Sequence, residues 1–519
     1  MKKIQLKEIE VNPDKKRILK STTDEKGRNK TFQESFLEHF GNKPDVVALA
    51  GGRVNLIGEH VDYPDVQFTG KDGAKLYSMG SAIQNNFCGA MSKRDDSKCV
   101  LVHLDAQEMF EISLKDLNGY EKACKQEREN KVPQTDRCLP EWAPHTLGTI
   151  KNALDQSINP KGLNVMMTSN VPFGAGLSAS AANCVALTMC LNEIFSLGLK
   201  EKIDIVTFAR ASENSIFAGG HCGWLDYQLI VQSQKGLLTQ VCYADNSIEY
   251  FESKLPSTMQ FIAVNTNVPH VLAESDYVVR VAELDFVIRF LSNFFGKAVS
   301  GPQLGLEFID QLIQLFDKKA TSDLSQKING DVRECLGAMD QDMLKKAHEE
   351  LKDFVAEKYS NLKFKNHEGL SKENSFVILM KRLRHQSVSS ALVSLAGKAA
   401  RSGESDVFGE LLTQEGKSLR MSGDFEITGT NGAQDRLLDI GFEVGRELSH
   451  MVYGRMLGGG GGGNVLFFVD RSSDEQYAIW KDTVCSRYDE WSAKTFTDKP
   501  VATTIEPLVS PGAKLCSVI

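Results

Sequence analysis

The sequence predicts a fold that combines helices and strands, of the α+β or α/β class, divided into more than one domain. Short β-rich runs, at residues 45–49, 163–167, 260–264 and 465–469, alternate with longer helical patterns. The chain has 519 residues, and at roughly 150 residues per domain this length predicts two to four domains. Hydrophobic residues make up 41% and charged residues 25% of the chain, which is ordinary for a globular protein and excludes wholesale disorder.

Charge and cysteine content exclude several classes of function. The formal net charge is −8, so the chain has no general basic field for nucleic acid or for an anionic membrane. No apolar run approaches the ~20 residues that span a bilayer, and the charged N-terminus lacks the apolar core of a signal peptide. The 11 cysteines are scattered without a CxxC pair, which is unremarkable in a reducing compartment. We expect a cytoplasmic protein that binds no nucleic acid and does not associate stably with a membrane.

The strongest local signal is a strand-like run, 164–170, followed by a turn rich in glycine and serine. The turn opens an apolar helix that is expected to end near Gly198. Glycines let the backbone approach a ligand, and the first turn of a helix offers unpaired N–H groups and a partial positive charge. The segment therefore suits phosphate, although a capped core helix would explain the same residues equally well.

A second cluster, at residues 52–63, packs Arg, Glu, His and Asp beside two glycines. Its carboxylates and imidazole could hydrogen-bond several hydroxyls, and Arg53 could neutralise a phosphoryl group. A strand end with a solvated loop would also explain the cluster. A third feature, six glycines at 458–463, is typical of a flexible linker. Since it directly precedes a strand-like run, a tight turn that only bare backbone can fill is the alternative.

Two further motifs are rejected. Residues 174–179 fit the GxGxx[G/A] dinucleotide fingerprint, but the acidic residue expected ~20 positions later should end a second strand. The nearest candidate, Glu193, lies inside the same helical pattern, so the sequence does not support a dinucleotide-dependent dehydrogenase. Residues 416–418 imitate the end of a Walker A loop, but Leu411 stands where the loop needs its first glycine.

Three tracts are expected to be surface insertions or extensions. Residues 115–140 are polar and charged, which favours a long loop or an exposed helix. Residues 318–375 are charged and carry apolar residues at helical spacing, which favours amphipathic helices. The tail after residue 496 lacks strong periodicity.

The order of the motifs resembles that of the galactokinase family within the GHMP small-molecule kinases. Five segments carry the resemblance: 52–63, 172–182, 213–226, 265–280 and 458–463. The first looks like the signature GRVNLIGEHxDY, matched without a gap. The second is similar to the phosphate loop P-x-G-x-G-L-S-S-S-A-A, with Ala179 in place of the middle serine.

The resemblance implies a role for each matching position. Asp226 would accept or orient the proton of the sugar's anomeric hydroxyl, and Arg53 would keep it ionised and stabilise the transferring phosphoryl group. Ser180 and Glu213 would bind Mg²⁺, and Trp142 would lie near the adenine of ATP. The phosphates would contact Gly174, Ala175, Gly176, Leu177, Ser178, Ala179 and Ser180. The sugar would contact Glu59, His60, Asp62, Gly223 and Tyr277.

Each of these residues also has a structural explanation when it is taken singly. Asp226 could be a structural acid, Glu213 part of a solvated helix face, and Tyr277 a half-buried core residue. The ordered occurrence of all five segments favours the functional interpretation.

The resemblance also implies the architecture: an α+β, two-domain GHMP kinase fold with the active site in the interdomain cleft. We expect an N-terminal domain over 1–250 and a C-terminal domain over 251–519 that includes the helical insertion 318–375. A crossover of the C-terminal segment back into the first domain is left open. A Gly/Asp-rich insertion within 64–78 departs from the family pattern beside the sugar-binding signature.

The expected reaction is the phosphorylation of galactose by MgATP, giving galactose 1-phosphate and ADP, by a monomer. Glu59 and Tyr277 favour a neutral hexose over a uronic acid, whose carboxylate Glu59 would repel. The alternatives are an N-acetylgalactosamine kinase and a catalytically silent galactose and ATP sensor on the same scaffold. Arg53, Ser180 and Asp226 are intact, which argues against the sensor.

Overall fold

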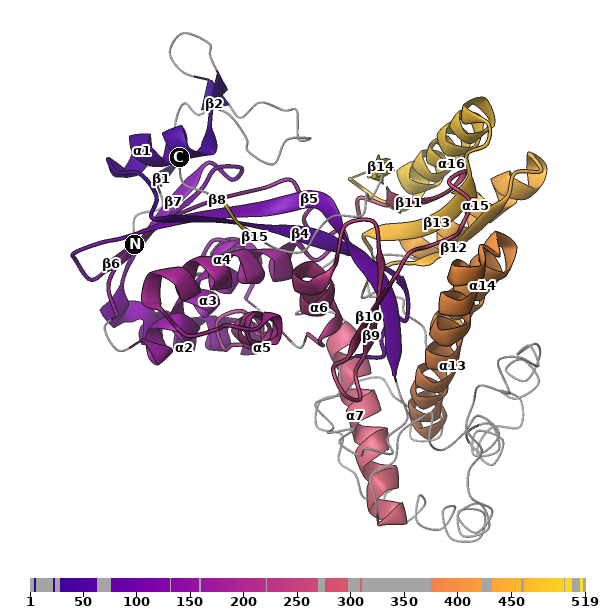
Figure 1. Ribbon diagram of the computed structural model, residues 1–519, viewed down its shortest axis with the longest axis horizontal. Coiled ribbons are helices and arrows are strands. Elements are labelled where there is room, and N and C mark those ends of the chain that lie inside the picture. The colour runs from indigo at the N-terminus through magenta and orange to yellow at the C-terminus, as the bar shows by residue number, and fades with distance from the viewer. Residues whose placement is uncertain are drawn as a thin grey trace. The chain divides into compact units, whose positions relative to one another are not determined.

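Figure 1 shows the chain as a computed structural model. The structure describes residues 4–5, 22–23, 29–62, 76–130, 132–157, 160–220, 222–268, 276–296, 309, 375–421, 432–458, 462–498, 500–505 and 514–516. The chain divides into two compact units. Unit 1 comprises Met1–Val54, Ser81–Leu237 and Pro507–Ile519, and unit 2 comprises Asn55–Gly80 and Leu238–Glu506.

Unit 1 contains a mixed sheet in the order β1-β7-β6-β8-β5-β4-β15. Its strands are β1 (Ile4–Gln5), β4 (Val46–Ile57), β5 (Tyr77–Lys93), β6 (Lys98–His103), β7 (Glu108–Ser113), β8 (Leu163–Ser169) and β15 (Lys514–Cys516). Strands β4 and β5 contribute residues to both units. Strands β6 and β8 are parallel, and β15 pairs antiparallel with β4. A separate pair of short strands, β2 (Thr22–Thr23) and β3 (Asn29–Lys30), lies between β1 and β4 in the chain.

Helices cover both faces of this sheet (Figure 1). Successive side chains of a strand point to opposite faces, so each face contributes to its own hydrophobic core. Val46 and Ala48 belong to the larger core, whereas Val47 belongs to the smaller one under α1. Helix α4 is apolar over most of its circumference, as expected for a helix that packs against its neighbours α3 and α5. The helices of unit 1 are α1 (Phe32–Phe40), α2 (Leu117–Glu129), α3 (Ala143–Gln156), α4 (Ala179–Phe195), α5 (Lys202–Glu213) and α6 (Leu225–Gln232), with short 3₁₀ turns η1 (Leu114–Asp116) and η2 (Gln134–Asp136).

Unit 2 contains a four-stranded sheet in the order β12-β13-β11-β14 and the hairpin β9–β10, which pairs with the start of β5. The strands are β9 (Leu238–Cys242), β10 (Ile248–Phe251), β11 (Met259–Asn265), β12 (Val452–Met456), β13 (Asn464–Asp470) and β14 (Thr503–Ile505). The described helices are α7 (Asp276–Phe295), α13 (Ser375–Ser402), α14 (Ser405–Met421), α15 (Ala433–Glu447) and α16 (Asp474–Thr495).

The two faces of the four-stranded sheet pack against different helices. Phe467 of β13 packs against Trp480 of α16, with ring centroids 5.2 Å apart. The next residue, Phe468, faces the other side and contacts Phe408 of α14 at 5.4 Å. Alternation along β13 therefore anchors helices on both sides of the sheet.

The structure confirms the four predicted strands as β4, β8, β11 and β13, and α4 ends at Phe195 as expected. Of the six glycines at 458–463, the structure describes Gly458, Gly462 and Gly463, which lie between the antiparallel neighbours β12 and β13 and so belong to a hairpin connection rather than to a linker between domains. The rejected Walker A mimic lies within α14, where a Cβ on Gly416 would come within 2.8 Å of the Arg455 Cβ. Helix α2 occupies half of the tract 115–140.

Other predictions fall partly or wholly outside the described residues. The insertion 318–375 lies outside them except for Ser375 at the start of α13, and so does most of 64–78. The predicted domain boundary near residue 250 stays a prediction; the units change at Leu237, and 55–80 belongs to unit 2. The crossover left open for the C-terminal segment is present, since β15 belongs to unit 1. Among the helices that the structure describes, none is long and apolar enough to cross a membrane.

Candidate active site

In unit 1, the loop 170–178 joins β8 to the N-terminus of α4. Gly174 and Gly176 have φ angles of 65° and 71°, a left-handed conformation that favours glycine. Ser178 is the N-cap of α4 and also has a positive φ, 60°. A non-glycine residue in this region is uncommon and often marks a functional constraint. The loop thus presents bare backbone and a helix N-terminus, which are the elements of an anion site.

Arg53 and Asp226 form an ion pair beside this loop. The Arg53 Nε donates to Asp226 Oδ1 at 2.7 Å, and its Nη1 donates to the Gly176 carbonyl oxygen at 2.5 Å. The Ser178 hydroxyl donates to the other oxygen, Asp226 Oδ2, at 2.5 Å. The Arg53 side chain is 6% exposed and that of Asp226 27%. The carboxylate is therefore oriented from both sides and still reaches solvent.

Close packing brings β4 against the loop. A Cβ on Gly52 would lie 2.6 Å from the Leu177 carbonyl oxygen and 2.9 Å from Val171 Cγ1. The backbone N–H of Arg53 donates to the same Leu177 oxygen at 3.1 Å. Any side chain at position 52 would push the loop away from Arg53. The glycine in the signature is thus a steric requirement.

Glu213, at the end of α5, is buried rather than part of a solvated helix face. The Tyr227 hydroxyl donates to its Oε2 at 2.6 Å. Its Oε1 has longer contacts, with the Cys222 thiol at 3.4 Å and His145 Nε2 at 3.7 Å. Tyr227 orients the carboxylate while Oε1 keeps only weak partners, which fits a hard cation such as Mg²⁺. Ser180, in the first turn of α4, would supply a hydroxyl oxygen, which is also a ligand that Mg²⁺ accepts.

Three other residues predicted to bind ATP or the sugar lie outside this group of contacts. The Trp142 indole, at the start of α3, donates to Glu108 Oε2 at 2.8 Å and packs on the His103 ring at 5.3 Å. Gly223 is buried, and its carbonyl oxygen accepts from Arg210 Nε at 3.1 Å. Tyr277 lies in α7, and its side chain is outside the described residues.

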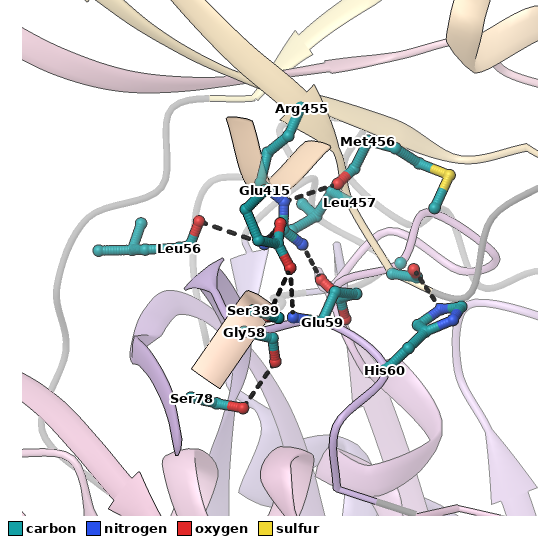
Figure 2. A network of polar contacts seen from close by, with 12 residues as sticks. Leu56, Gly58, Glu59, His60, Ser78, Ser389, Glu415, Arg455, Met456 and Leu457 are labelled. Atoms are coloured by element: carbon teal, nitrogen blue, oxygen red, sulfur yellow. Dashed lines mark hydrogen bonds and ion pairs between the residues drawn. The ribbon is translucent and has the colours of Figure 1, made fainter. Parts of the chain in front are cut away.

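In unit 2, the predicted sugar-binding residues Glu59 and His60 belong to a buried polar network (Figure 2). The Arg455 guanidinium, fully buried on β12, pairs with Glu59 Oε2 through Nη2 and with Glu415 Oε2 at 3.1 Å through Nη1. It also donates to the carbonyl oxygens of Leu56 at 3.3 Å and Met456 at 2.9 Å. Both carboxylates are nearly or completely buried. A buried charge of this kind is tolerable only because it is paired.

The same network holds the backbone of the signature. Glu415 Oε1 accepts from the Glu59 N–H at 3.0 Å and from the Ser389 hydroxyl at 3.1 Å. His385 Nε2 lies 3.0 Å from the Glu59 carbonyl oxygen, and His60 Nε2 lies 3.3 Å from that of Gly458. Glu59 is thereby fixed through its side chain, its N–H and its carbonyl. Gly458, at the start of the glycine-rich connection, contacts His60, the residue that follows Glu59.

Burial lowers the pKa of His60 well below its usual 6.5, and the nearby His385, Arg382 and Arg455 lower it further, against the effect of the Gly458 hydrogen bond. Burial also lowers the pKa of His385, although Glu415 and the Glu59 carbonyl oppose the shift. Both imidazoles are therefore kept neutral in the folded protein.

This gives a pH-dependent stability. Below about pH 6.5 the unfolded chain binds protons at both imidazoles that the folded chain does not bind, so the free energy of unfolding falls as the pH drops. We expect up to about 1.4 kcal/mol per pH unit for each group. Urea unfolding at pH 7.5, 6.5 and 5.5 measures this loss, which should be shallower in His385→Gln. Equal slopes in the two proteins would contradict the assignment.

The sequence pointed to Arg53, Asp226 and the loop, which the structure brings together. It missed the second role of Ser178, whose hydroxyl orients Asp226. It also missed Tyr227, whose hydroxyl orients Glu213. Arg455, Glu415 and His385 carried no usable signal, because only the fold brings them to Glu59.

Two family profiles match parts of the chain. Residues 145–233 match the profile described as GHMP kinases N terminal domain, and residues 34–67 match the galactokinase galactose-binding signature. The first range contains the loop and Asp226. The second contains Arg53, Glu59, His60 and Asp62.

Several curated proteins are similar in sequence. The galactokinase of Actinobacillus pleuropneumoniae serotype 5b (strain L20) is 29% identical over 300 residues, which are 57% of this chain and 67% of the relative. That of Clostridium tetani (strain Massachusetts / E88) is 25% identical over 263 residues, 50% of this chain and 59% of the relative. The matched stretches thus span 59% and 67% of these relatives' own lengths.

Among solved structures, Lactococcus lactis galactokinase complexed with galactose is similar, with a TM-score of 0.60 and 20% sequence identity. The match covers 93% of this chain and 98% of that one. The α+β, two-domain GHMP kinase fold predicted from the sequence is confirmed. The position of the active site in a cleft between the domains stays a prediction.

Proposed function

We propose that this chain, which has the two-domain fold of the GHMP kinases and carries a galactokinase galactose-binding signature, is an ATP-dependent galactokinase. It would transfer the γ-phosphoryl group of ATP to the anomeric hydroxyl of galactose, giving galactose 1-phosphate and ADP. One observation carries the proposal: the Arg53–Asp226 pair lies directly on the glycine-rich loop at the start of α4. An acid–base group, a phosphoryl-stabilising cation and an anion site are thus adjacent.

Asp226 is the group that we assign to the proton of the sugar. Its Oδ2, oriented by Ser178, would accept the proton of the anomeric hydroxyl as that oxygen forms its bond to the γ-phosphorus. In the same step the bond between the γ-phosphorus and the bridging oxygen would break, with its electron pair leaving on ADP. Since the transition state of phosphoryl transfer is loose, positioning and charge stabilisation supply most of the catalysis.

Arg53 and the loop are assigned to the phosphates. The guanidinium bridges Asp226 and the Gly176 carbonyl, so its charge is held beside the loop without further reorganisation. Backbone N–H groups of 174–180 would bind the β- and γ-phosphates. Trp142 is proposed to lie near the adenine.

Magnesium is the implied cofactor, and the donor set fits it. The Ser180 hydroxyl and Glu213 Oε1 would hold the ion, with Tyr227 fixing the Glu213 carboxylate. When bound, the ion would neutralise charge on the nucleotide phosphates.

The sugar is assigned to Glu59, His60, Asp62, Gly223 and Tyr277. Two carboxylates around one guanidinium leave the Arg455 network with a formal excess of one negative charge. Such a site disfavours an anionic sugar and supports a neutral hexose over a uronic acid. Galactose is proposed over N-acetylgalactosamine on the strength of the matched signature.

We further propose that the protein works as a monomer in the cytoplasm. The cysteines whose side chains the structure describes are free thiols, as expected in a reducing compartment.

An ADP-release assay with galactose, N-acetylgalactosamine, glucose and galacturonate tests the proposal. We expect turnover to be fastest with galactose and absent above the sugar-free background with galacturonate. Faster turnover of N-acetylgalactosamine would reassign the substrate. No turnover of any sugar, together with measurable ATP binding, would replace the kinase by a sensor.

Arg53→Lys is expected to lower kcat by about 10²- to 10³-fold. An ammonium group is a point charge and cannot contact both Asp226 and the Gly176 carbonyl as the planar guanidinium does. Steady-state kinetics with saturating galactose and ATP measure the loss. Arg94→Lys is the matched control, since Arg94 pairs with Asp96 at a more exposed place in the same unit. A kcat within threefold of wild type in Arg53→Lys would remove Arg53 from the mechanism.

A further inference from the structure

Unit 1 contains a second cluster of chemically reactive side chains, in the tract 115–140 and separate from the Arg53–Asp226 pair. Cys124 and Glu127 lie on α2, three residues apart and so on the same face of the helix. Cys138 follows the 3₁₀ turn η2 and approaches them from the segment that leads into α3. One ligand atom from each of the three residues lies within 4.8 Å of the others.

One sulfur–oxygen distance in the cluster matches that of a compact metal site. The Cys138 thiol lies 3.4 Å from Glu127 Oε2, and the Cys138 N–H donates to Glu127 Oε1 at 2.8 Å. Zinc bonds of about 2.3 Å to sulfur and about 2.1 Å to oxygen give tetrahedral ligand–ligand edges of roughly 3.6–3.8 Å. The sulfur–oxygen edge already present is within about 0.2 Å of that value. The other ligand–ligand distances are at most 4.8 Å, so side-chain movements of up to about 1 Å would complete a three-ligand set.

We propose that Cys124, Glu127 and Cys138 form a binding site for a thiophilic divalent metal ion, of the kind that zinc occupies with two sulfurs, one carboxylate oxygen and one water. Cys124 is buried, while Glu127 and Cys138 are partly exposed, so an ion and its water can enter from solvent. On binding, each thiol loses its proton to solvent as its sulfur–metal bond forms. The Cys138 N–H fixes the orientation of the Glu127 carboxylate in the way that outer groups orient metal ligands.

The surrounding charge suits such an ion. Two thiolates and a carboxylate with one divalent cation carry a formal charge of −1. Arg128 follows Glu127 on α2, and Arg137 directly precedes Cys138, so two guanidiniums belong to neighbours of the proposed ligands. The two guanidiniums are held by carbonyl oxygens, Arg128 on that of Phe217 at 2.7 Å and Arg137 on that of Val132 at 2.9 Å. They can balance the charge of the site without competing as ligands.

The site would fasten the tract to the rest of unit 1. The metal would link α2 to the segment that ends at Trp142, four residues after Cys138. Its role is therefore structural, and it stands independently of the proposed kinase reaction.

The test is metal binding by the full chain, freed of metal and kept reduced with a phosphine so that no disulfide can form. We expect one equivalent of Cd²⁺ to give a sulfur-to-cadmium charge-transfer band, and a large excess of Zn²⁺ to weaken the band by competition. Cys124→Ser and Cys138→Ser should each weaken Cd²⁺ binding at least tenfold and remove most of the band. Glu127→Gln should weaken binding while keeping the band, because both sulfurs remain. Zn²⁺ should raise the melting temperature of wild type and not that of Cys138→Ser.

Two control variants separate this site from other thiols. Cys222→Ser removes a thiol that also contacts a carboxylate, Glu213, at 3.4 Å, and Cys485→Ser removes a partly exposed thiol of unit 2. Both should keep wild-type Cd²⁺ binding. Circular dichroism of the metal-free variants confirms that each is folded. A missing band in folded wild type, or a Kd unchanged by both Cys124→Ser and Cys138→Ser, would overturn the proposal.

Discussion

Asp226→Asn is expected to lower kcat for galactose phosphorylation by about 10²- to 10⁴-fold while ATP affinity stays near the wild-type value. An amide cannot accept the proton of the anomeric hydroxyl. It can still accept a hydrogen bond from Arg53 Nε and donate one to the Ser178 oxygen, so the local structure should persist. Steady-state kinetics and nucleotide titration of the same preparation separate the two effects.

The matched control for this variant is Asp96→Asn, which removes another arginine-paired carboxylate of unit 1, at a more exposed position. We expect its kcat to be unchanged. Ser178→Ala should have a smaller effect than Asp226→Asn, because it removes one orienting hydrogen bond and leaves the base. If Asp226→Asn keeps a kcat within about threefold of wild type, the carboxylate only orients the sugar.

Arg455→Met is expected to destabilise the protein by about 3–5 kcal/mol, because it leaves Glu59 and Glu415 buried without their shared cation. At roughly 2–4 °C per kcal/mol for a unit of this size, the melting temperature should fall clearly. Calorimetry and urea unfolding of the full chain measure both quantities. KM for galactose should also rise in any folded fraction, since Arg455 holds the Glu59 side chain.

A triple variant tests whether the unpaired carboxylates cause this loss of stability. Arg455→Met combined with Glu59→Gln and Glu415→Gln should recover part of the stability, because the uncompensated charges are then removed. Arg487→Met serves as the control, since its pair with Glu447 is half-exposed and should contribute less than about 1 kcal/mol. A loss in Arg455→Met no larger than that in Arg487→Met would show that the network is not important for stability.

Local sequence was sufficient for the parts of the site that lie in short segments. The turn at Gly174 and Gly176 and the helix after it follow from residues adjacent in the chain, and the structure has them as expected. The four predicted strands also follow from local patterns. Asp226, in contrast, could be assigned from the sequence only through the resemblance, because its partner Arg53 is 173 positions away.

The Arg455 network shows where such reasoning stops. Glu59 meets Arg455 across 396 positions, Glu415 across 356 and His385 across 326. Glu415 and His385 lie on helices. A helical pattern in the sequence does not show which distant residue such a side chain will contact. In the sequence, residues 416–418 only imitate the end of a Walker A loop, yet in the structure the Ser418 hydroxyl lies 3.1 Å from His385 Nδ1.

The sequence by itself determined that the chain mixes helices and strands, that a turn rich in glycine and serine opens α4, and which residues match a sugar-kinase signature. These features depend on glycine conformations, on apolar periodicity and on residues close together in the chain. The tertiary structure alone decided that Ser178 orients Asp226, that Tyr227 orients Glu213, that Arg455 neutralises Glu59, and that Cys124 and Cys138 meet. Each of these depends on which distant segments pack together, because burial leaves a charged or hydrogen-bonding group stable only where the fold supplies its partner.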